Sequence, residues 1–422
     1  MHRVPARPAL PPGPYLVVGL ARSGAAIARA LTAHGEVIGS DAREPRQAEG
    51  LDGVEVHLRS DGLDLLDRAR TVVKSPGVPG DAPAPAAARA RGLEVTGELE
   101  LAWRLVPNPF IAVTGTNGKT TTVELLGEIY RAAGIPVAVA GNVGTPLASL
   151  VGTVDPEAIV ICEASSFQLE DSSAFAPECA VLLNVQEDHL DRHGDLERYR
   201  EAKMRVFSNQ QAGDHAIDPQ VTAAETAIDG GVLSVRGEAL LPLEDIRLRG
   251  AHNLENVRAA ALAALAMGVP ADAVVRALRA FAGVPHRLQE VATVNGVLYV
   301  NDSKATNVAS AVKGIEAFES GVRAILGGSL KGGDFTGLRE SLRARAQAAY
   351  LIGEAQERLA SDLDGTIPLH RCGTLEAAVR QASDAASPGE VVLLSPACAS
   401  FDAFRDYEDR GNRFRTLVPA SE

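Results

Sequence analysis

The stretch FIAVTGTNGKTTTVE, residues 110–124, decides how this chain of 422 residues is organised. Its first four residues form an apolar run that predicts a buried strand, and a helix is expected to begin at Lys119. A strand that leads through a glycine-containing turn into a helix directs backbone N–H groups and the positive end of the helix dipole at an anion. The pattern therefore predicts a cradle for the phosphates of a nucleotide.

Each part of the cradle has an expected role. Lys119 is expected to bridge the terminal phosphates, and the hydroxyl of Thr120 or Thr121 is expected to hold Mg²⁺. The full pattern G-x-x-x-x-G-K-[ST] requires glycine where this chain has Val113, so an ordinary glycine-rich turn is the alternative for the shorter G-x-x-G-K-T. The loop residues expected to contact the phosphates are Gly115, Thr116, Asn117 and Gly118.

Length and composition set limits on the function. A chain of this length with 46% hydrophobic residues is expected to form two or three domains with sizeable cores. Its formal net charge of −13 argues against general binding to nucleic acid or to a membrane surface. No run of about 18 apolar residues is present, so we predict no transmembrane helix.

The N-terminus and the cysteines bear on location. Residues 1–14 are basic but lack the apolar segment of a secretory signal, and we interpret them as a disordered tail. The four cysteines show no paired spacing. A long chain with few cysteines and no signal is expected to be cytoplasmic, with free thiols.

Lysine is rare in this chain. Of its 41 basic residues only six are lysine, so arginine serves wherever a general cation is sufficient. Some of the six are therefore expected to supply a compact ammonium or a modifiable amine, with chance as the alternative for any single one. They are Lys74, Lys119, Lys203, Lys304, Lys313 and Lys331.

The residues before the cradle predict a nucleotide-binding βαβ unit. A strand at 15–18 runs into GLARSG and a helix, and a second strand ends at Asp41. Because Ala21 replaces the middle glycine of the dinucleotide fingerprint, a Rossmann-like domain for another nucleotide is favoured over NAD binding. A unit without any ligand is the remaining alternative. The strand at 71–74 is expected to end at the same sheet edge, beside Ser75.

Two strands after the cradle are expected to join its sheet in parallel, at 158–162 and 179–183. They bring Glu163 and His189 to the carboxyl edge, where a carboxylate suits Mg²⁺. A helix N-terminal acid would also explain Glu163, and a structural histidine would explain His189. By its spacing alone, Lys203 is an ordinary solvated lysine.

Asn253 and Asn256 lie three residues apart at the start of a predicted helix and share one of its faces. They either hold a nucleotide or cap the helix. Beyond a linker at 283–285, further strands with polar ends predict another α/β domain. We therefore predict an α/β chain with a Rossmann-like domain over 1–97, a central P-loop ATPase-like parallel-sheet domain over 98–283 and a C-terminal Rossmann-like α/β domain over 284–422.

A series of motifs then points to a family. The segments GTNGKTTT, GNVGTP, EASSFQLE, NVQEDHLDRH, HNLEN, PHRLQ, NDSKATN, GGSLKGGDF and SPACASFD occur in this order. Together they resemble the Mur ligases of peptidoglycan synthesis, and the resemblance extends over 19–411. Three segments, SSFQLE, NDSKATN and SPACAS, are most similar to the D-glutamate-adding branch of that family.

The resemblance implies an ATP-driven ligase that joins D-glutamate to UDP-N-acetylmuramoyl-L-alanine through an acyl phosphate and a tetrahedral intermediate. It also implies two Mg²⁺ ions, a carbamylated Lys203, and separate domains for the UDP-sugar, ATP and the amino acid. We expect a monomer without a nucleic-acid partner.

The resemblance also implies roles for individual residues. Catalysis falls on Lys119, Glu163, His189 and Lys203, and the implied metal ligands are Thr120, Thr121, Glu163, His189 and Lys203. The ATP contacts beyond the cradle are Asn253, Asn256, Arg287, Asp302 and Lys304. The UDP-substrate contacts are Leu20, Ala21, Arg22, Asp41, Arg43, Ser75, Asn142, Ser165 and Ser166. The D-glutamate contacts are Thr306, Lys331, Ser400, Phe401 and Tyr407, with Lys331 as partner of the side-chain carboxylate.

Several positions depart from the family pattern, and three other functions compete. The departures at Ala21, Ala42, Ser329, Leu330 and Tyr407 leave fine details of the UDP and D-glutamate contacts open. A ligase for L-lysine, diaminopimelate or folate polyglutamate should differ in the C-terminal loops. An NAD-dependent oxidoreductase leaves everything after residue 110 unexplained, and a regulatory module without chemistry does not require the set Glu163, His189 and Lys203.

Overall fold

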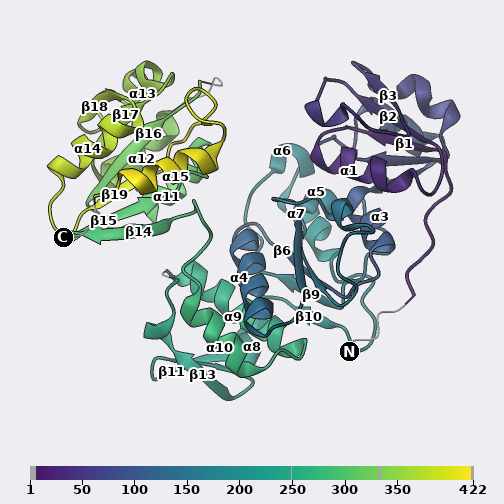
Figure 1. Cartoon of the computed structure of the whole chain (residues 1–422), viewed down its shortest axis with the longest axis horizontal. Coiled ribbons are helices and arrows are strands. Elements are labelled where there is room, and N and C mark those ends of the chain that lie inside the picture. Colours follow the sequence, from purple (N-terminus) through teal and green to yellow (C-terminus); the bar gives the residue numbers. More distant parts are fainter. Residues whose placement is uncertain (1–5, 249, 331–333, 420–422) are drawn as a thin grey trace. The chain divides into compact units, whose positions relative to one another are not determined.

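The structure is a computed structural model that describes residues 6–248, 250–330 and 334–419. The chain divides into two compact units, over residues 1–281 and 282–422. This division lies close to the linker expected at 283–285. We describe the two units separately (Figure 1).

The first unit begins with a sheet of five parallel strands in the order β3-β2-β1-β4-β5. Strand β1 is buried throughout, as its apolar sequence predicts, and β4 is buried throughout as well, including its last residue, Lys74. Because the strand order reverses between β1 and β4, a crevice for ligands is expected beyond their carboxyl ends. The strands are β1 (Tyr15–Val18), β2 (Val37–Asp41), β3 (Val54–Leu58), β4 (Thr71–Lys74) and β5 (Glu94–Gly97).

Three helices belong to this sheet. Helix α1 buries Ile27 and Leu31 on one face, which its amphipathic sequence predicts. The helix begins so close to the preceding loop that a Cβ atom on Gly24 would lie 1.7 Å from the carbonyl oxygen of Gly19. This position therefore requires glycine. The helices are α1 (Arg22–Leu31), α2 (Pro83–Ala90) and α3 (Glu98–Leu105).

A second parallel sheet of five strands follows, in the order β10-β9-β6-β8-β7. Its central strand is β6, the apolar run of the predicted cradle, with β8 and β9 on either side. The carboxyl ends of these three strands therefore meet at one edge, as predicted. The strands are β6 (Phe110–Thr114), β7 (Val137–Gly141), β8 (Ile159–Glu163), β9 (Cys179–Leu182) and β10 (His215–Ile217).

Seven helices and a small antiparallel sheet complete the first unit among its described residues. The segment 213–238, for which short β segments were predicted, contains strands but also the unexpected helix α8. The helices are α4 (Lys119–Ala132), α5 (Ser166–Leu169), α6 (Leu190–His193), α7 (Leu196–Met204), α8 (Pro219–Glu225), α9 (Ala251–Ala266) and α10 (Ala271–Ala280). The antiparallel strands are β11 (Thr226–Asp229), β12 (Val232–Val235) and β13 (Glu238–Pro242).

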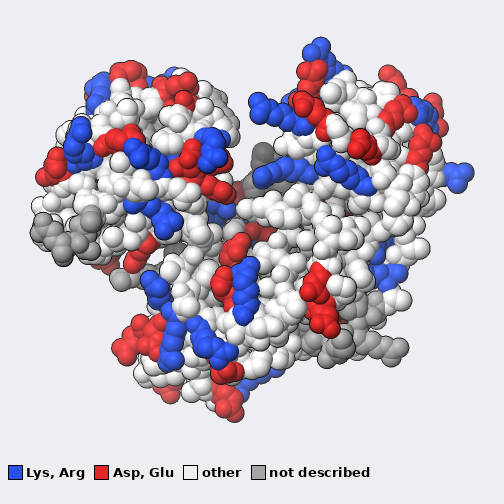
Figure 2. Space-filling model, viewed as in Figure 1, with Lys and Arg blue, Asp and Glu red and all other residues white. Residues whose placement is uncertain are grey.

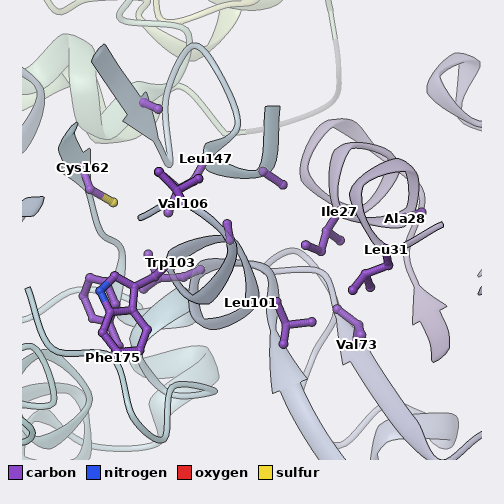
Figure 3. Packing of buried hydrophobic residues seen from close by; sticks show 14 of the residues in the cluster. Ile27, Ala28, Leu31, Val73, Leu101, Trp103, Val106, Leu147, Cys162 and Phe175 are labelled. Atoms are coloured by element: carbon purple, nitrogen blue, oxygen red, sulfur yellow. The ribbon is translucent and has the colours of Figure 1, made fainter. Parts of the chain in front are cut away.

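One hydrophobic cluster connects the two parallel sheets of this unit. It contains Leu31 of α1 and Val73 of β4, continues through Leu101 and Trp103 of α3, and reaches Phe175 beside the central sheet (Figure 3). Trp103 and Phe175 meet edge to face, with ring centroids 5.7 Å apart. The predicted boundary at residue 97 thus lies inside a shared core.

The N-terminal segment corrects one prediction. The Arg7 guanidinium lies 4.8 Å from the ring centroid of Trp103 and contacts the carbonyl oxygens of Trp103 and Asn108. The Tyr15 hydroxyl donates to Pro11 O over 2.8 Å. Residues 6–14 therefore pack against the fold, and the prediction of a disordered tail is wrong for them. The partners of Arg7 are carbonyl oxygens and an aromatic ring about 100 residues away, which the local sequence does not reveal.

The second unit contains a sheet of six strands in the order β14-β15-β19-β16-β17-β18. Among these described strands, β14 and β15 pair antiparallel and the other neighbours pair parallel. The strand order reverses around β19, so the carboxyl ends of β15, β16 and β19 lie together. The strands are β14 (Gln289–Val294), β15 (Val297–Asn301), β16 (Val322–Gly327), β17 (Ala346–Ile352), β18 (Leu369–Gly373) and β19 (Val391–Leu394).

Helices pack on both faces of this sheet, because two separate hydrophobic clusters cover its opposite sides. The helices are α11 (Val308–Glu316), α12 (Arg339–Arg345), α13 (Gln356–Asp362), α14 (Leu375–Ala385) and α15 (Tyr407–Leu417). None of the described helices combines the length and apolar character of a membrane-spanning segment. On the described residues of the face drawn in Figure 2, acidic and basic side chains are interspersed.

Candidate active site

The predicted phosphate cradle lies at the carboxyl end of β6, in the loop that leads into α4. Gly118 adopts φ 86°, and a side chain there would meet Asn256 Oδ1 at 2.1 Å. Only glycine combines this backbone conformation with such close approach to α9. The local sequence thus folds into the turn that the pattern predicted, and Asn256 lies directly over it.

Three residues that the sequence analysis did not single out hold this loop. Asn184, at the end of β9, accepts from the backbone N–H of Asn117 over 2.9 Å. Gln186 donates its backbone N–H to Thr116 Oγ1 over 3.0 Å, and the Tyr199 hydroxyl lies 3.3 Å from the same oxygen. The sequence could have indicated Asn184 and Gln186, because they come directly after a predicted strand. Tyr199 comes from α7, and no sequence pattern indicated its role.

Lys119 folds back over the loop at the start of α4. Its Nζ donates to Gly115 O over 2.8 Å and to Thr116 O over 2.9 Å. These contacts keep the ammonium beside the backbone that is expected to surround the phosphates. The arrangement suits an anion, because the ammonium and the helix N-terminus are both positive.

Thr120, Glu163 and Asn142 meet at the carboxyl edge of the central sheet. The Thr120 hydroxyl donates to Glu163 Oε2 over 2.9 Å, and Asn142 Nδ2 donates to Glu163 Oε1 over 3.2 Å. Glu163 is buried, and neither neutral partner balances its charge. A carboxylate next to a hydroxyl is a suitable pair of oxygen ligands for Mg²⁺. Thr121 is buried in the same helical turn.

Lys203 corrects the expectation from spacing alone. Its side chain is only 1% exposed, and Nζ donates to Gly115 O over 2.8 Å. The amine also lies 4.4 Å from the ring centroid of Tyr199. Burial, together with the charge of Lys119, lowers the pKa of Lys203 to about 7. The lysine is therefore a buried amine at the cradle, because α7 packs its inner face against the loop.

His189 lies near this group but is exposed. It adopts φ 53°, and its ring centroid is 4.8 Å from that of Phe167 and 6.3 Å from that of Tyr199. The structure brings it to the edge that holds Glu163 and Lys203. Within the described residues, no three His, Cys, Asp or Glu side chains form a ready metal-binding group.

Ser165 and Ser166 begin the short helix α5 after β8. Ser165 forms a capping box with Gln168, because its hydroxyl accepts from Gln168 N while the Gln168 side chain accepts from Ser165 N. Ser166 Oγ lies 3.0 Å from His193 Nε2. Burial lowers the pKa of His193, which favours the neutral ring.

The predicted UDP-substrate residues of the first sheet gather at its carboxyl edge. Asp41 Oδ2 accepts from Leu20 N over 2.7 Å, and Asp41 Oδ1 accepts from Arg43 N over 2.8 Å. Ser75 lies against Gly19. A Cβ atom placed on Gly19 would lie only 2.9 Å from Ser75 Cβ. The side chain of Arg22 is exposed, as is that of Arg43.

The position of Ala21 does not require glycine. Ala21 is the N-cap of α1, and its φ of −68° is open to any residue. The capping interpretation of the two asparagines is not supported either. Gly250 occupies the N-cap position of α9, so neither asparagine does, and Asn256 Nδ2 donates to Asn253 Oδ1 over 3.3 Å. The pair therefore forms one polar surface beside the cradle.

In the second unit, Asp302 lies at the carboxyl end of β15. It accepts from Ser395 Oγ over 2.7 Å and from Leu288 N over 3.2 Å. Burial raises the pKa of Asp302 to about 6. Arg287 is exposed near this carboxylate, and Lys304 Nζ lies 5.7 Å from the ring centroid of Tyr407.

The predicted D-glutamate residues that the structure describes share the edge formed by β15, β16 and β19. Thr306 N donates to Lys304 O over 2.9 Å, and Ser400 is buried. Phe401 is 64% exposed, which is unusual for a large apolar side chain. Lys331 lies outside the described residues, so its role remains a prediction.

Arg410 of α15 was missed by the sequence analysis. Its side chain is fully buried, and its donors reach Ser303 Oγ at 3.0 Å, Ser303 O at 2.9 Å, Cys398 O at 3.1 Å and Ala399 O at 3.2 Å. Burial lowers the pKa of Arg410 to about 10. This one guanidinium thus joins the segments after β15 and β19, and only its burial distinguishes it from the many other arginines.

Comparison with known proteins finds relatives over nearly the whole chain. The family models described as "Mur ligase middle domain" and "Mur ligase, glutamate ligase domain" match residues 113–229 and 286–398. The chain is 43% identical over 444 residues to the UDP-N-acetylmuramoylalanine–D-glutamate ligase of Acidobacterium capsulatum, covering 96% of each chain. It is 42% identical over 437 residues to the ligase of the same name from Geotalea uraniireducens, again covering 96% of each.

Solved structures show the same fold at low sequence identity. The UDP-N-acetylmuramate-alanine ligase of Thermotoga maritima superposes with a TM-score of 0.57 at 18% identity, covering 95% of this chain and 97% of that one. The MurF ligase of Thermotoga maritima in complex with ADP gives a TM-score of 0.54 at 18% identity, covering 92% and 95%. From its relatives over almost its full length, this chain belongs to the Mur ligase family.

Proposed function

We propose that this protein is an ATP-dependent ligase that joins D-glutamate to UDP-N-acetylmuramoyl-L-alanine. The observation that carries the proposal is the convergence of Lys119, Glu163 and Lys203 at one edge of the central sheet. Relatives that share about two fifths of the sequence over nearly the whole chain are named as ligases of this specificity, which supports the same acceptor and amino acid here.

In this proposal the loop 115–118 and Lys119 hold the phosphates of ATP. The asparagines of α9 contact the nucleotide from the other side of the loop. Arg287, Asp302 and Lys304 are proposed as further ATP contacts. The ADP complex of a Thermotoga maritima relative supports nucleotide binding by this fold.

Thr120 and Glu163 fit a Mg²⁺ ion, because the two hydrogen bonds that the buried carboxylate accepts, from Thr120 and Asn142, come from neutral groups. His189 and a modified Lys203 are proposed to hold a second ion. When bound, Mg²⁺ supplies positive charge that neutralises the phosphoryl oxygens. The protein's part is to fix the two oxygen ligands before the substrates arrive.

The chemistry follows from the reactants. A carboxylate is a poor electrophile, so an oxygen of the L-alanyl carboxylate attacks the γ-phosphorus of ATP and ADP leaves. The amine of D-glutamate then attacks the acyl carbon, the tetrahedral intermediate expels phosphate, and the new amide loses a proton. Such reactions depend mainly on positioning and on charge stabilisation.

Lys203 is proposed to carry a carbamate. A neutral amine adds to CO₂ with loss of one proton, and the lowered pKa of Lys203 supplies the neutral form near pH 7. The product exchanges a cation for an anionic oxygen group, which is suited to Mg²⁺. The charge change also ends the repulsion between Lys203 and Lys119.

The substrates are proposed to occupy the edges already described. The first-sheet residues Leu20, Asp41, Arg43 and Ser75 hold the UDP-sugar, and Asn142, Ser165 and Ser166 lie near its reacting end. Ser400, Phe401 and Tyr407 surround D-glutamate together with Thr306. This assignment implies one domain for each substrate.

The first experiment measures phosphate release from ATP with UDP-N-acetylmuramoyl-L-alanine, Mg²⁺ and bicarbonate. D-glutamate, L-glutamate, L-lysine and diaminopimelate are compared as the amino acid. Release with D-glutamate alone is expected. Release with another amine would retain a ligase and reject this specificity, and no release with any of them would reject the proposed function.

A further inference from the structure

Lys74 is one of the six lysines, and the proposed chemistry gives it no role. It is the last residue of β4, directly before Ser75, and its side chain is 0% exposed. Its Nζ forms an ion pair with Asp171 Oδ2 at 2.7 Å and donates to Val78 O over 2.9 Å. One ammonium therefore binds both the loop after β4 and a carboxylate in the segment after β8 of the central sheet.

Asp171 and Glu170 follow α5, the helix that begins with Ser165 and Ser166 at the other part of the acceptor site. Glu170 Oε1 lies 3.4 Å from Lys74 Nζ. The acidic pair is therefore attached by one short helix to the residues proposed to lie near the reacting carboxylate. A shift of this pair relative to Lys74 would move the two halves of the acceptor site apart.

Arg192 makes the same connection from a third element. Its guanidinium donates to Pro76 O over 3.0 Å and to Val78 O over 3.1 Å, and it also contacts Glu170. It lies 4.3 Å from the ring centroid of Phe167 in α5. Arg192 belongs to α6, which follows His189, so the segment of the proposed second metal ligand is connected as well.

Arg89 of α2 adds a third cation. It pairs with Asp171 Oδ1 at 3.1 Å and donates to Gly80 O over 2.7 Å. The loop 75–80 is therefore held through its carbonyl oxygens by three cations that share two carboxylates. Contacts to backbone atoms restrain the path of a loop, whereas a pair between two side chains would leave the loop free to move.

We propose that Lys74 and Arg192 are positioning residues of the acceptor site, which hold the loop 75–80 against the segment 165–171 and so set the separation between the UDP-sugar and its reacting carboxylate. This inference rests on the proposed function. A buried ion pair contributes little net stability, because its formation must offset the desolvation of both charges. Its value here lies in geometry, since a misplacement of about 1 Å lowers the rate of a positioned reaction roughly a hundredfold.

The test separates positioning from folding with the variants Lys74→Met, Asp171→Asn and the double variant Lys74→Met/Asp171→Asn. Each single change leaves a buried charge without its main partner, so the Tm should fall. The double change removes both charges, so the Tm should recover towards wild type. The kcat should nevertheless remain lowered and the KM for UDP-N-acetylmuramoyl-L-alanine raised, each by roughly tenfold or more, while the KM for ATP stays within about twofold.

A matched control is Arg91→Met, which breaks the exposed pair of Arg91 with Asp67 (2.7 Å) beside the same sheet and should change neither KM. Arg192→Met provides a second route, because Arg192 is partly exposed and its loss should be tolerated by the fold. It should show the same selective rise in acceptor KM.

Recovery of the acceptor KM together with the Tm in the double variant would overturn the inference, as would a parallel rise in both KM values in Arg192→Met. A wild-type protein that releases phosphate with D-glutamate while the variants show no selective rise refutes the positioning role alone. A wild-type protein that neither binds nor turns over the UDP-substrate refutes the proposed function and this inference with it.

Discussion

Lys119 and Lys203 donate to the same carbonyl oxygen, that of Gly115, each over 2.8 Å. One lysine begins α4 and the other lies in α7, so the loop between β6 and α4 brings two amines together. Their proximity, added to the burial of Lys203, explains why the pKa of Lys203 falls to about 7. The phosphate cradle and the candidate carbamate site are thus one structure.

Replacement of Lys119 by alanine should lower ATP turnover by roughly 10³-fold or more, because the charge that compensates the phosphates is lost. The fold should persist, since Lys119 lies in a loop-to-helix junction that is only partly buried. Phosphate release and the circular-dichroism melt measure the two effects. Lys313→Ala, an exposed lysine of α11, is the control. Normal turnover in Lys119→Ala would refute the cradle assignment.

Lys203→Ala should be nearly inactive, and a short-chain carboxylate such as acetate or propionate should restore part of the activity by replacing the carbamate oxygens. Phosphate release at increasing carboxylate concentration measures the rescue. Labelled bicarbonate and carbon NMR should show a carbamate signal in the wild type that the variant lacks. Wild-type activity in the variant would exclude the carbamate.

The pKa of Lys203 also predicts a pH-dependent stability. Between about pH 7 and its ordinary value of 10.5, the unfolded chain binds the lysine proton more tightly than the folded chain. The burial of this amine therefore lowers the free energy of unfolding by its full amount below about pH 7. This destabilisation becomes smaller as the pH rises towards 10.5. In bicarbonate-free buffer, Lys203→Met should raise the Tm more at pH 6 than at pH 9. An equal effect at both pH values would contradict the buried amine.

Asp302 predicts the opposite dependence. Its folded pKa of about 6 lies above its ordinary value of 3.8, so the loss of stability develops as the pH rises through this window. Asp302→Asn should fit the same site, because the amide can accept from Leu288 N and donate to Ser395 Oγ. Its Tm advantage over wild type should be larger at pH 8 than at pH 4.5, as thermal melts at both values would show. A constant difference would argue against a buried charge.

Arg410→Lys should destabilise the second unit by about 2–4 kcal/mol, because an ammonium cannot reach the carbonyl oxygens that the guanidinium joins. Urea unfolding followed by fluorescence or circular dichroism measures this loss. The KM for D-glutamate should also rise, since the segments after β15 and β19 would separate. Arg380→Lys, an exposed change on α14, should leave both quantities unaltered. If Arg410→Lys changes neither the free energy of unfolding nor the KM for D-glutamate, other contacts hold these segments.

The sequence predicted strands β1, β2 and β4 of the first sheet and β6, β8 and β9 of the central sheet, with the loops at their carboxyl ends, but it did not predict β3 or β5. This succeeded because a buried parallel strand is a continuous apolar run, and because Gly118 and the lysine after it form a local signal. It failed for residues 6–14, for helix α8 and for the environment of Lys203. In each case a distant partner, such as Trp103 for Arg7, decided the outcome.

The family of this protein, its cradle and most of its candidate site were therefore determined by local patterns that the chain carries at fixed spacing. The tertiary structure alone decided which lysines are buried, which carbonyl oxygens they meet and which arginine connects the loops. Lys74 and Asp171 lie far apart in the sequence, as do Ser303 and Arg410, and neither pair is marked by any spacing rule. Their contacts arise only when packing brings separate elements together, because burial and ion pairing depend on neighbours in space.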